Sequence, residues 1–143
     1  KEVAHALSIG SELREDVEDV RFTDCDVIHD LGREWTLRVY HCDSARIRNV
    51  RFENLRIEES PRLISLWIGT AVWTRDDQRG HIEGVTFRNI RATANPLRIE
   101  LKGFDETHVV EQVGFEDVVV NGRPLVARDV STNAFVRNVT IRP

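Results

Sequence analysis

The side chains of this chain with the clearest chemical potential are aromatic, cationic and acidic residues on short strand-like segments. Strand alternation places a set of them on one outward surface: Ser8, Arg38, Tyr40, Ser65, Trp67, Arg98, Glu100 and Lys102. Aromatic rings stack on the apolar faces of sugars, and arginine pairs with carboxylates through two hydrogen bonds. The surface therefore predicts binding of a polysaccharide or oligosaccharide, an acidic one above all. Its substrate-binding candidates are Arg38, Tyr40, Trp67, Arg98 and Glu100. The alternative interpretation is an ordinary solvated sheet face.

Each of these segments precedes one copy of an internal repeat. The segments are Leu7–Ser11, Thr36–Tyr40, Ile64–Ile68, Leu97–Leu101 and Leu125–Arg128, and the repeat copies begin at Val17, Ile47, Ile82, Val110 and Val136. A copy reads apolar, two polar, apolar, polar, aromatic, polar, Asn or Asp, as in Ile47-Arg-Asn-Val-Arg-Phe-Glu-Asn54. A long period that carries strand-type alternation predicts stacked coils.

Stacking the copies predicts two columns of equivalent residues. One is aromatic and is capped by Ile141: Phe22, Phe52, Phe87 and Phe115. The other lies at a bend, where side-chain amides can bond the neighbouring coils: Asp24, Asn54, Asn89 and Asp117. The predicted fold is all-β, a right-handed parallel β-helix of about five coils that forms a single domain over residues 1–143. The loop 70–80 is the longest connection, and we expect it to form a functional lip.

Composition narrows the function classes. The chain has 143 residues and a net charge of −4, and its basic residues alternate with acidic ones, which argues against a nucleic-acid partner. Its apolar runs fall short of the ~18 residues of a membrane span, so we expect no membrane partner. The histidines show no metal-ligand spacing, so we expect no metal site and no cofactor. Cys25 fits an interior position, and we expect Cys25 and Cys42 to be free thiols.

The segment Ala4-His5-Ala-Leu-Ser-Ile-Gly-Ser11 resembles the Gly-His-Gly-Ile-Ser-Ile-Gly-Ser motif of the polygalacturonases, glycoside hydrolase family 28. The segment Leu37-Arg38-Val39-Tyr40 falls one coil later, where that family carries Arg-Ile-Lys. The resemblance implies a pectin-lyase-like solenoid. It also implies an auxiliary catalytic role for His5 beside the catalytic acids, and a substrate carboxylate bound by Arg38. The sequence departs from the motifs at the two alanines that flank His5 and at Tyr40, which replaces the motif lysine.

The family's catalytic aspartate motifs precede this histidine by a coil or more. We therefore expect the chain to be the C-terminal portion of a longer secreted or periplasmic glycoside hydrolase, inactive by itself on polysaccharide, because hydrolysis needs two carboxylates. Two alternatives stay open: a non-catalytic scaffold or carbohydrate-binding module, and a fragment of a β-helix polysaccharide lyase. The first coil carries no capping segment, which predicts end-to-end self-association through that coil.

Overall fold

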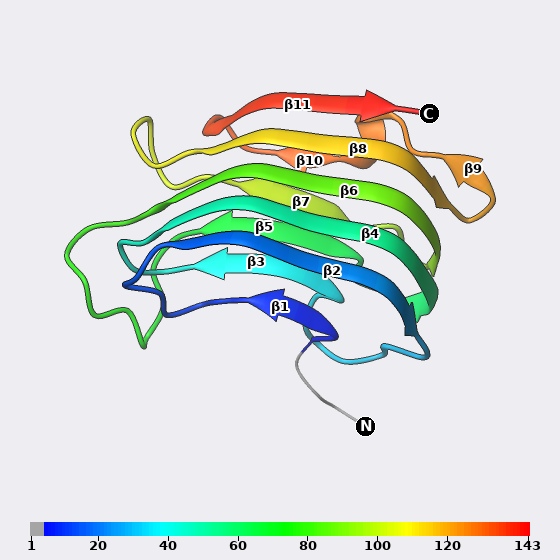
Figure 1. The fold of residues 1–143 in the computed structure, drawn as a ribbon, viewed down its shortest axis with the longest axis horizontal. Helices are drawn as coiled ribbons and strands as arrows, with labels where there is room; N and C mark the ends of the chain where they lie inside the picture. The colour runs from blue at the N-terminus through cyan, green and yellow to red at the C-terminus, as the bar shows by residue number, and fades with distance from the viewer. Residues whose placement is uncertain (1–4) are drawn as a thin grey trace.

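The protein winds into a β-solenoid of about five turns (Figure 1), which confirms the predicted parallel β-helix. The computed structural model describes residues 5–143, so Ala4 of the His5 segment lies outside the described residues. Each coil contributes one short and one long strand. The short strands form a sheet in the order β1 (Leu7–Ile9), β3 (Leu37–His41), β5 (Ile64–Ile68), β7 (Ile99–Lys102), β10 (Ser131–Thr132). The long strands form a second sheet in the order β2 (Val17–Val27), β4 (Arg46–Ser60), β6 (His81–Ala94), β8 (Val110–Val120), β11 (Val136–Arg142).

Neighbouring coils pair in parallel and in register. Phe22 pairs with Phe52, Phe52 with Phe87, Phe87 with Phe115, and Phe115 with Ile141, as the repeat predicts. The phenyl rings form a stack with centroids 5.0–5.1 Å apart and interplanar angles of 9–20°. The three inner phenylalanines are fully buried in a core cluster that both sheets line. The position of this column determines which face of each long strand points into the core.

The Asn/Asp column forms at a bend of the long strand, also as predicted. Asp24, Asn54, Asn89 and Asp117 all have left-handed backbone angles, with φ between 50° and 58°. Asn and Asp tolerate this region better than other residues with a side chain. The Asn89 amide donates to Asn54 Oδ1 at 2.9 Å, and the Asn54 amide donates to Asp24 Oδ1 at 3.1 Å.

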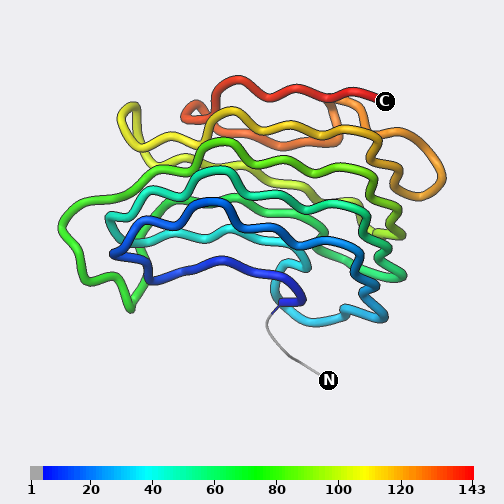
Figure 2. Tube along the Cα trace, viewed as in Figure 1, coloured from blue at the N-terminus to red at the C-terminus, as the bar shows by residue number. Residues whose placement is uncertain are grey.

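Each long strand has a second residue with left-handed backbone angles, five residues before the Asn/Asp column. The sequence did not predict this second position. The residues there are Asp19, Asn49, Gly84, Gln112 and Asn138, with φ between 52° and 68°. The two bends divide a long strand into three straight parts, and successive coils repeat the same bends (Figure 2). The long-strand sheet therefore turns around most of the core.

The fifth coil differs from the prediction. Leu125–Arg128 is not a strand: a short 3-10 turn, η1 (Ala127–Asp129), occupies this place, and β10 follows it. Asp129 accepts a hydrogen bond from the Val126 N–H at 2.9 Å and pairs with Arg123 at 2.8 Å, which stabilises a turn. A two-residue strand, β9 (Arg123–Pro124), pairs antiparallel with β8 beside it.

No helix within residues 5–143 is both long enough and apolar enough to span a membrane.

The phenylalanine stack gives a stability prediction. Phe87→Ala removes a fully buried ring that lies between two others, so we expect a loss of about 3–5 kcal/mol in the free energy of unfolding. Urea unfolding followed by circular dichroism measures this loss. Phe104→Ala is the control, because Phe104 is 39% exposed, and it should change the free energy by about 0.5 kcal/mol or less. Equal losses in the two variants would contradict the assignment of the core.

Candidate functional site

The outward face of the short-strand sheet, here called the short-strand face, presents two rows of side chains in register. Strand pairing places Ser8 beside Arg38, Arg38 beside Ser65, and Ser65 beside Glu100. In the next row, Tyr40 pairs with Trp67 and Trp67 with Lys102. Seven of the eight predicted outward residues therefore lie on one surface that crosses four coils: Ser8, Arg38, Tyr40, Ser65, Trp67, Glu100 and Lys102.

Arg38 is the most constrained residue of the short-strand face. Its Nε donates to Ser8 Oγ at 2.8 Å, and its Nη1 lies 3.7 Å from Glu34 Oε2. Its guanidinium carbon lies 4.4 Å from the centroid of the Tyr40 ring, in a cation–π contact. The side chain is only 11% exposed. The neighbours of Arg38 thus hold it in one orientation, and one edge of its guanidinium meets a carboxylate.

Tyr40 and Trp67 form an aromatic platform beside Arg38. Their ring centroids are 5.1 Å apart and the rings are tilted by 42°. The Trp67 ring extends across Gly69, where a Cβ atom would lie 2.3 Å from the indole. Burial raises the pKa of Tyr40, so the phenol stays neutral and accepts a hydrogen bond from Ser65 at 3.4 Å. The platform is a neutral, partly exposed surface of the kind that packs against a sugar ring.

His5 lies near Arg38, as the spacing of one coil predicts. Burial is the main cause that lowers the pKa of His5, and the charge of Arg38 lowers it further, while Glu34 and Asp30 oppose the shift. The imidazole is therefore neutral at neutral pH. The Nδ1 atom of His5 is buried and has no hydrogen-bond partner among residues 5–143. A buried polar atom without a partner is uncommon in folded proteins, where water, an ion, strain or a catalytic role accounts for it.

Two carboxylates at this site, Asp30 and Glu34, were not predicted from the sequence. Both come from the loop between β2 and β3, which carries no repeat pattern. Asp30 is 9% exposed, and its Oδ2 also has no partner in the described part of the chain. Glu34 is 45% exposed on its side chain and faces Arg38. The only available signal was the position of Glu34 four residues before Arg38, which by itself does not specify a contact.

The remaining predicted residues lie farther along the short-strand face. Glu100 is separated from Arg38 by the strand of Ser65, and its Oε2 lies 3.5 Å from Lys102 Nζ. Arg98 is exposed, but β7 begins one residue later, so Arg98 lies at the margin of the sheet. The structure thus groups His5, Arg38, Tyr40 and Trp67 closely, with Glu100 beside the group and Arg98 at its edge.

The predicted lip loop 70–80 is anchored at the corner between the two sheets. Asp43, which is fully buried, accepts hydrogen bonds from the backbone N–H groups of Arg75 at 2.9 Å and Asp76 at 2.8 Å. The buried Arg79 donates to the Cys42 carbonyl. From the exposed part of the loop, Trp73 Nε1 donates to Ser11 Oγ at 2.8 Å, beyond the end of β1. The loop therefore crosses the ends of the short strands and bounds one side of the short-strand face.

A separate hollow lies over the C-terminal parts of the long strands β2, β4, β6 and β8. Its volume is about 530 Å³, and an ion pair between Arg56 and Asp26, 2.5 Å apart, lies at its wall together with Ile57 and Ala92. The hollow is mostly apolar, and none of the predicted sugar-binding residues lines it.

Comparison with known proteins finds no relative: no family model, no curated protein and no solved structure matches the chain.

The anchor of the lip loop gives a pH prediction. Burial by itself would raise the pKa of Asp43, but the two backbone N–H bonds, with the charges of Arg14 and Arg79, bring the pKa below its ordinary value of 3.8. A lowered pKa means that the carboxylate stabilises the fold above about pH 4 and that this stabilisation is lost as the pH falls through the folded-state pKa. Asp43→Asn should therefore flatten the fall in stability below pH 4, as acid-unfolding curves can show. Asp77→Asn, an exposed change in the same loop, should leave the slope unaltered, and equal slopes in all three proteins would contradict this role.

Proposed function

We propose that the chain binds a glycan along the short-strand face, as the sugar-binding segment of a glycoside hydrolase of the polygalacturonase type. The observation that carries the proposal is the Tyr40–Trp67 platform, held beside a fixed arginine on a surface that crosses four coils. The resemblance of the His5 segment and of Arg38 to family 28 supports the choice of glycan. No relative supports the family itself, so it rests on these motifs alone.

The charges of the short-strand face support a ligand that carries both hydroxyl and carboxylate groups. Arg38 and Lys102 each face a carboxylate, Glu34 at 3.7 Å and Glu100 at 3.5 Å. These contacts are longer than a well-formed charged hydrogen bond of about 2.7–2.9 Å. A uronate can therefore compete with Glu34 for Arg38, while the two glutamates accept hydrogen bonds from sugar hydroxyls. The platform then packs against a ring of the same glycan.

Calorimetric titration with oligogalacturonate, and with a neutral oligosaccharide of equal length, tests the glycan proposal. We expect the acidic oligosaccharide to bind more tightly, and Trp67→Ala to weaken binding about tenfold, which corresponds to the loss of one ring-stacking contact. Arg38→Gln should remove the preference for the acidic ligand. The matched control is Arg88→Gln, since Arg88 lies on β6 of the long-strand sheet and pairs there with Glu116.

Two outcomes would contradict this function. One is the absence of binding to either oligosaccharide, and the other is unaltered affinity in a folded Trp67→Ala variant. Thermal melts of each variant distinguish a lost contact from a lost fold.

Self-association is a second candidate function, and the register of the outer strands favours it. The inward residues of β2 and β11 are only partly buried: Val17, Val20, Phe22, Val136, Val139 and Ile141. If β11 of one copy continued the stack onto β2 of a second copy, Ile141 would face Phe22 and Arg137 would face Glu18. Within the chain, Glu18 already pairs with an arginine at the equivalent position of the next coil, Arg48, at 2.7 Å. We therefore propose head-to-tail stacking of copies.

Light scattering at micromolar concentration tests this stacking. Arg137→Glu would place two acidic side chains opposite each other and should shift oligomers toward monomers. Arg142→Glu is the control, because the same charge change on β11 would face Thr23 and not an acid. A monomeric unaltered protein, or equal effects of the two variants, would contradict the proposed register.

A further inference from the structure

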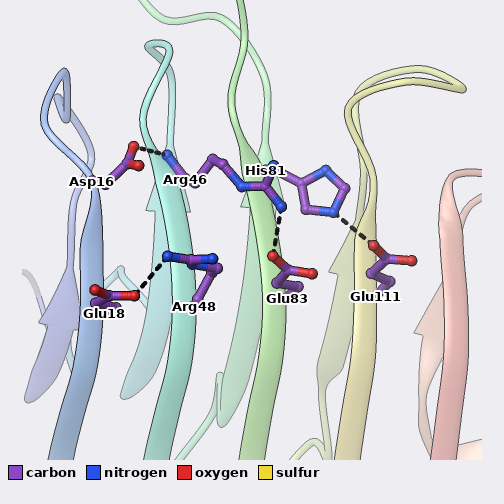
Figure 3. Close-up of polar contacts among 7 residues, drawn as sticks. All are labelled: Asp16, Glu18, Arg46, Arg48, His81, Glu83 and Glu111. Atoms are coloured by element: carbon purple, nitrogen blue, oxygen red, sulfur yellow. Dashed lines mark hydrogen bonds and ion pairs between the residues drawn. The ribbon is translucent and has the colours of Figure 1, made fainter.

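A polar cluster lies on the outer face of the long-strand sheet, away from the short-strand face (Figure 3). It lies where β4, β6 and β8 begin. His81 and Glu83 are two residues apart on β6, so strand alternation turns both side chains outward. Glu83 pairs in register with Glu111 of β8. Two neighbouring coils thus bring one imidazole and two carboxylates to the same place.

The three side chains are close enough to share a ligand. His81 Nε2 lies 2.8 Å from Glu111 Oε1, and one donor atom from each of the three residues lies within 4.8 Å of the others. The side chains are 18%, 20% and 24% exposed for His81, Glu83 and Glu111. The cluster is therefore a half-buried, preformed group of one nitrogen and two oxygen donors that remains open to water on one side.

We propose that His81, Glu83 and Glu111 bind a divalent transition-metal ion, with zinc as the best fit. Zinc takes imidazole nitrogen and carboxylate oxygen together, and three protein ligands with a water as the fourth complete a tetrahedral site. Calcium and magnesium take oxygen ligands almost exclusively, so the imidazole argues against them. The inference is independent of glycan binding, because the cluster lies on the other sheet.

Arg46 supports this assignment as a positioning residue. Its Nη2 donates to Glu83 Oε1 at 2.7 Å, and its backbone N–H donates to Asp16 Oδ1 at 2.9 Å (Figure 3). The second carboxylate oxygen of Glu83 is left to face the ion. Carboxylates that bind metals are commonly oriented by such outer hydrogen bonds. Arg46 and the two glutamates together carry a net charge of −1 before a dication binds.

The other histidine–carboxylate pairs in the described part of the chain lack a third donor. His29 lies 3.0 Å from Glu59, and His108 lies 2.7 Å from Asp105. Among residues 5–143, the grouping of three potential ligands occurs at His81 alone. Judged along the sequence, each histidine stands apart, which is why the sequence predicted no metal site. The ligands come together only through the register of β6 and β8.

Calorimetric titration of the full chain with zinc chloride at pH 7.5 tests the site. We expect one zinc ion per chain and a rise in melting temperature with zinc. His81→Gln and Glu111→Gln should each weaken binding by about tenfold or more, since even outer partners of a metal site contribute 10–100-fold. Binding should also weaken as the pH is lowered, because protons compete with the metal for its ligands.

The matched control is His29→Gln, which removes an exposed histidine from a pair with one carboxylate. Its affinity for zinc should equal that of the unaltered chain. Circular dichroism shows whether the variants fold. If His81→Gln does not fold, Glu111→Gln still tests the proposal. The proposal is overturned if the chain binds no zinc. It is also overturned if folded His81→Gln and Glu111→Gln bind zinc as tightly as the unaltered chain, or if His29→Gln weakens binding as much as they do.

Discussion

The whole structure depends on one constraint: equivalent residues of successive coils must stack directly on one another. Parallel pairing in register gives the backbone N–H and C=O groups of the inner strands their hydrogen-bond partners, and it places equivalent residues of neighbouring coils beside each other. The phenyl rings stack at about the spacing of the strands themselves. The same register sets the Asn and Asp side chains in a ladder where each can bond the next. The residue at one position of a coil therefore limits which residue types fit at the equivalent position of the adjacent coils.

This constraint also explains how the charges are arranged on the outer surface. Arg48 meets Glu18, Arg56 meets Asp26, and Arg46 meets Glu83, each across one coil boundary. Like charges opposite each other are unfavourable in a sheet, so these pairs of opposite charge stabilise the exposed face. Like charges do stand opposite each other at Arg21 and Arg51, at Arg56 and Arg91, and at Glu83 and Glu111. At Glu83 and Glu111 a histidine lies beside the two acids, and this makes the cluster chemically distinctive.

The repeat made the fold predictable, because each column recurs at the same place in every copy. The Phe column and the Asn/Asp column could be aligned without any three-dimensional knowledge, and so could the outward positions of Arg38, Tyr40 and Trp67. The loops could not be aligned, since they vary in length and carry no pattern. Asp30, Glu34 and the buried anchor Asp43 all lie in such connections, and the hydrogen bonds of Asp43 reach the loop of the next coil. The strand predicted at Leu125–Arg128 failed for a local reason, the capping of a turn by Asp129.

The partly buried column residues of the first coil have a dynamic consequence. Val17, Val20 and Phe22 contact one neighbouring coil, whereas Phe52 and Phe87 lie between two. In a linear array, the units at the ends open more readily than those inside. His5 and Arg38 belong to the first two coils, and His81 and Glu111 to the third and fourth. A ligand that bridges the first two of the described coils would therefore spend part of its binding free energy on ordering the outer coil, while an ion at the inner coils would meet a surface already held rigid.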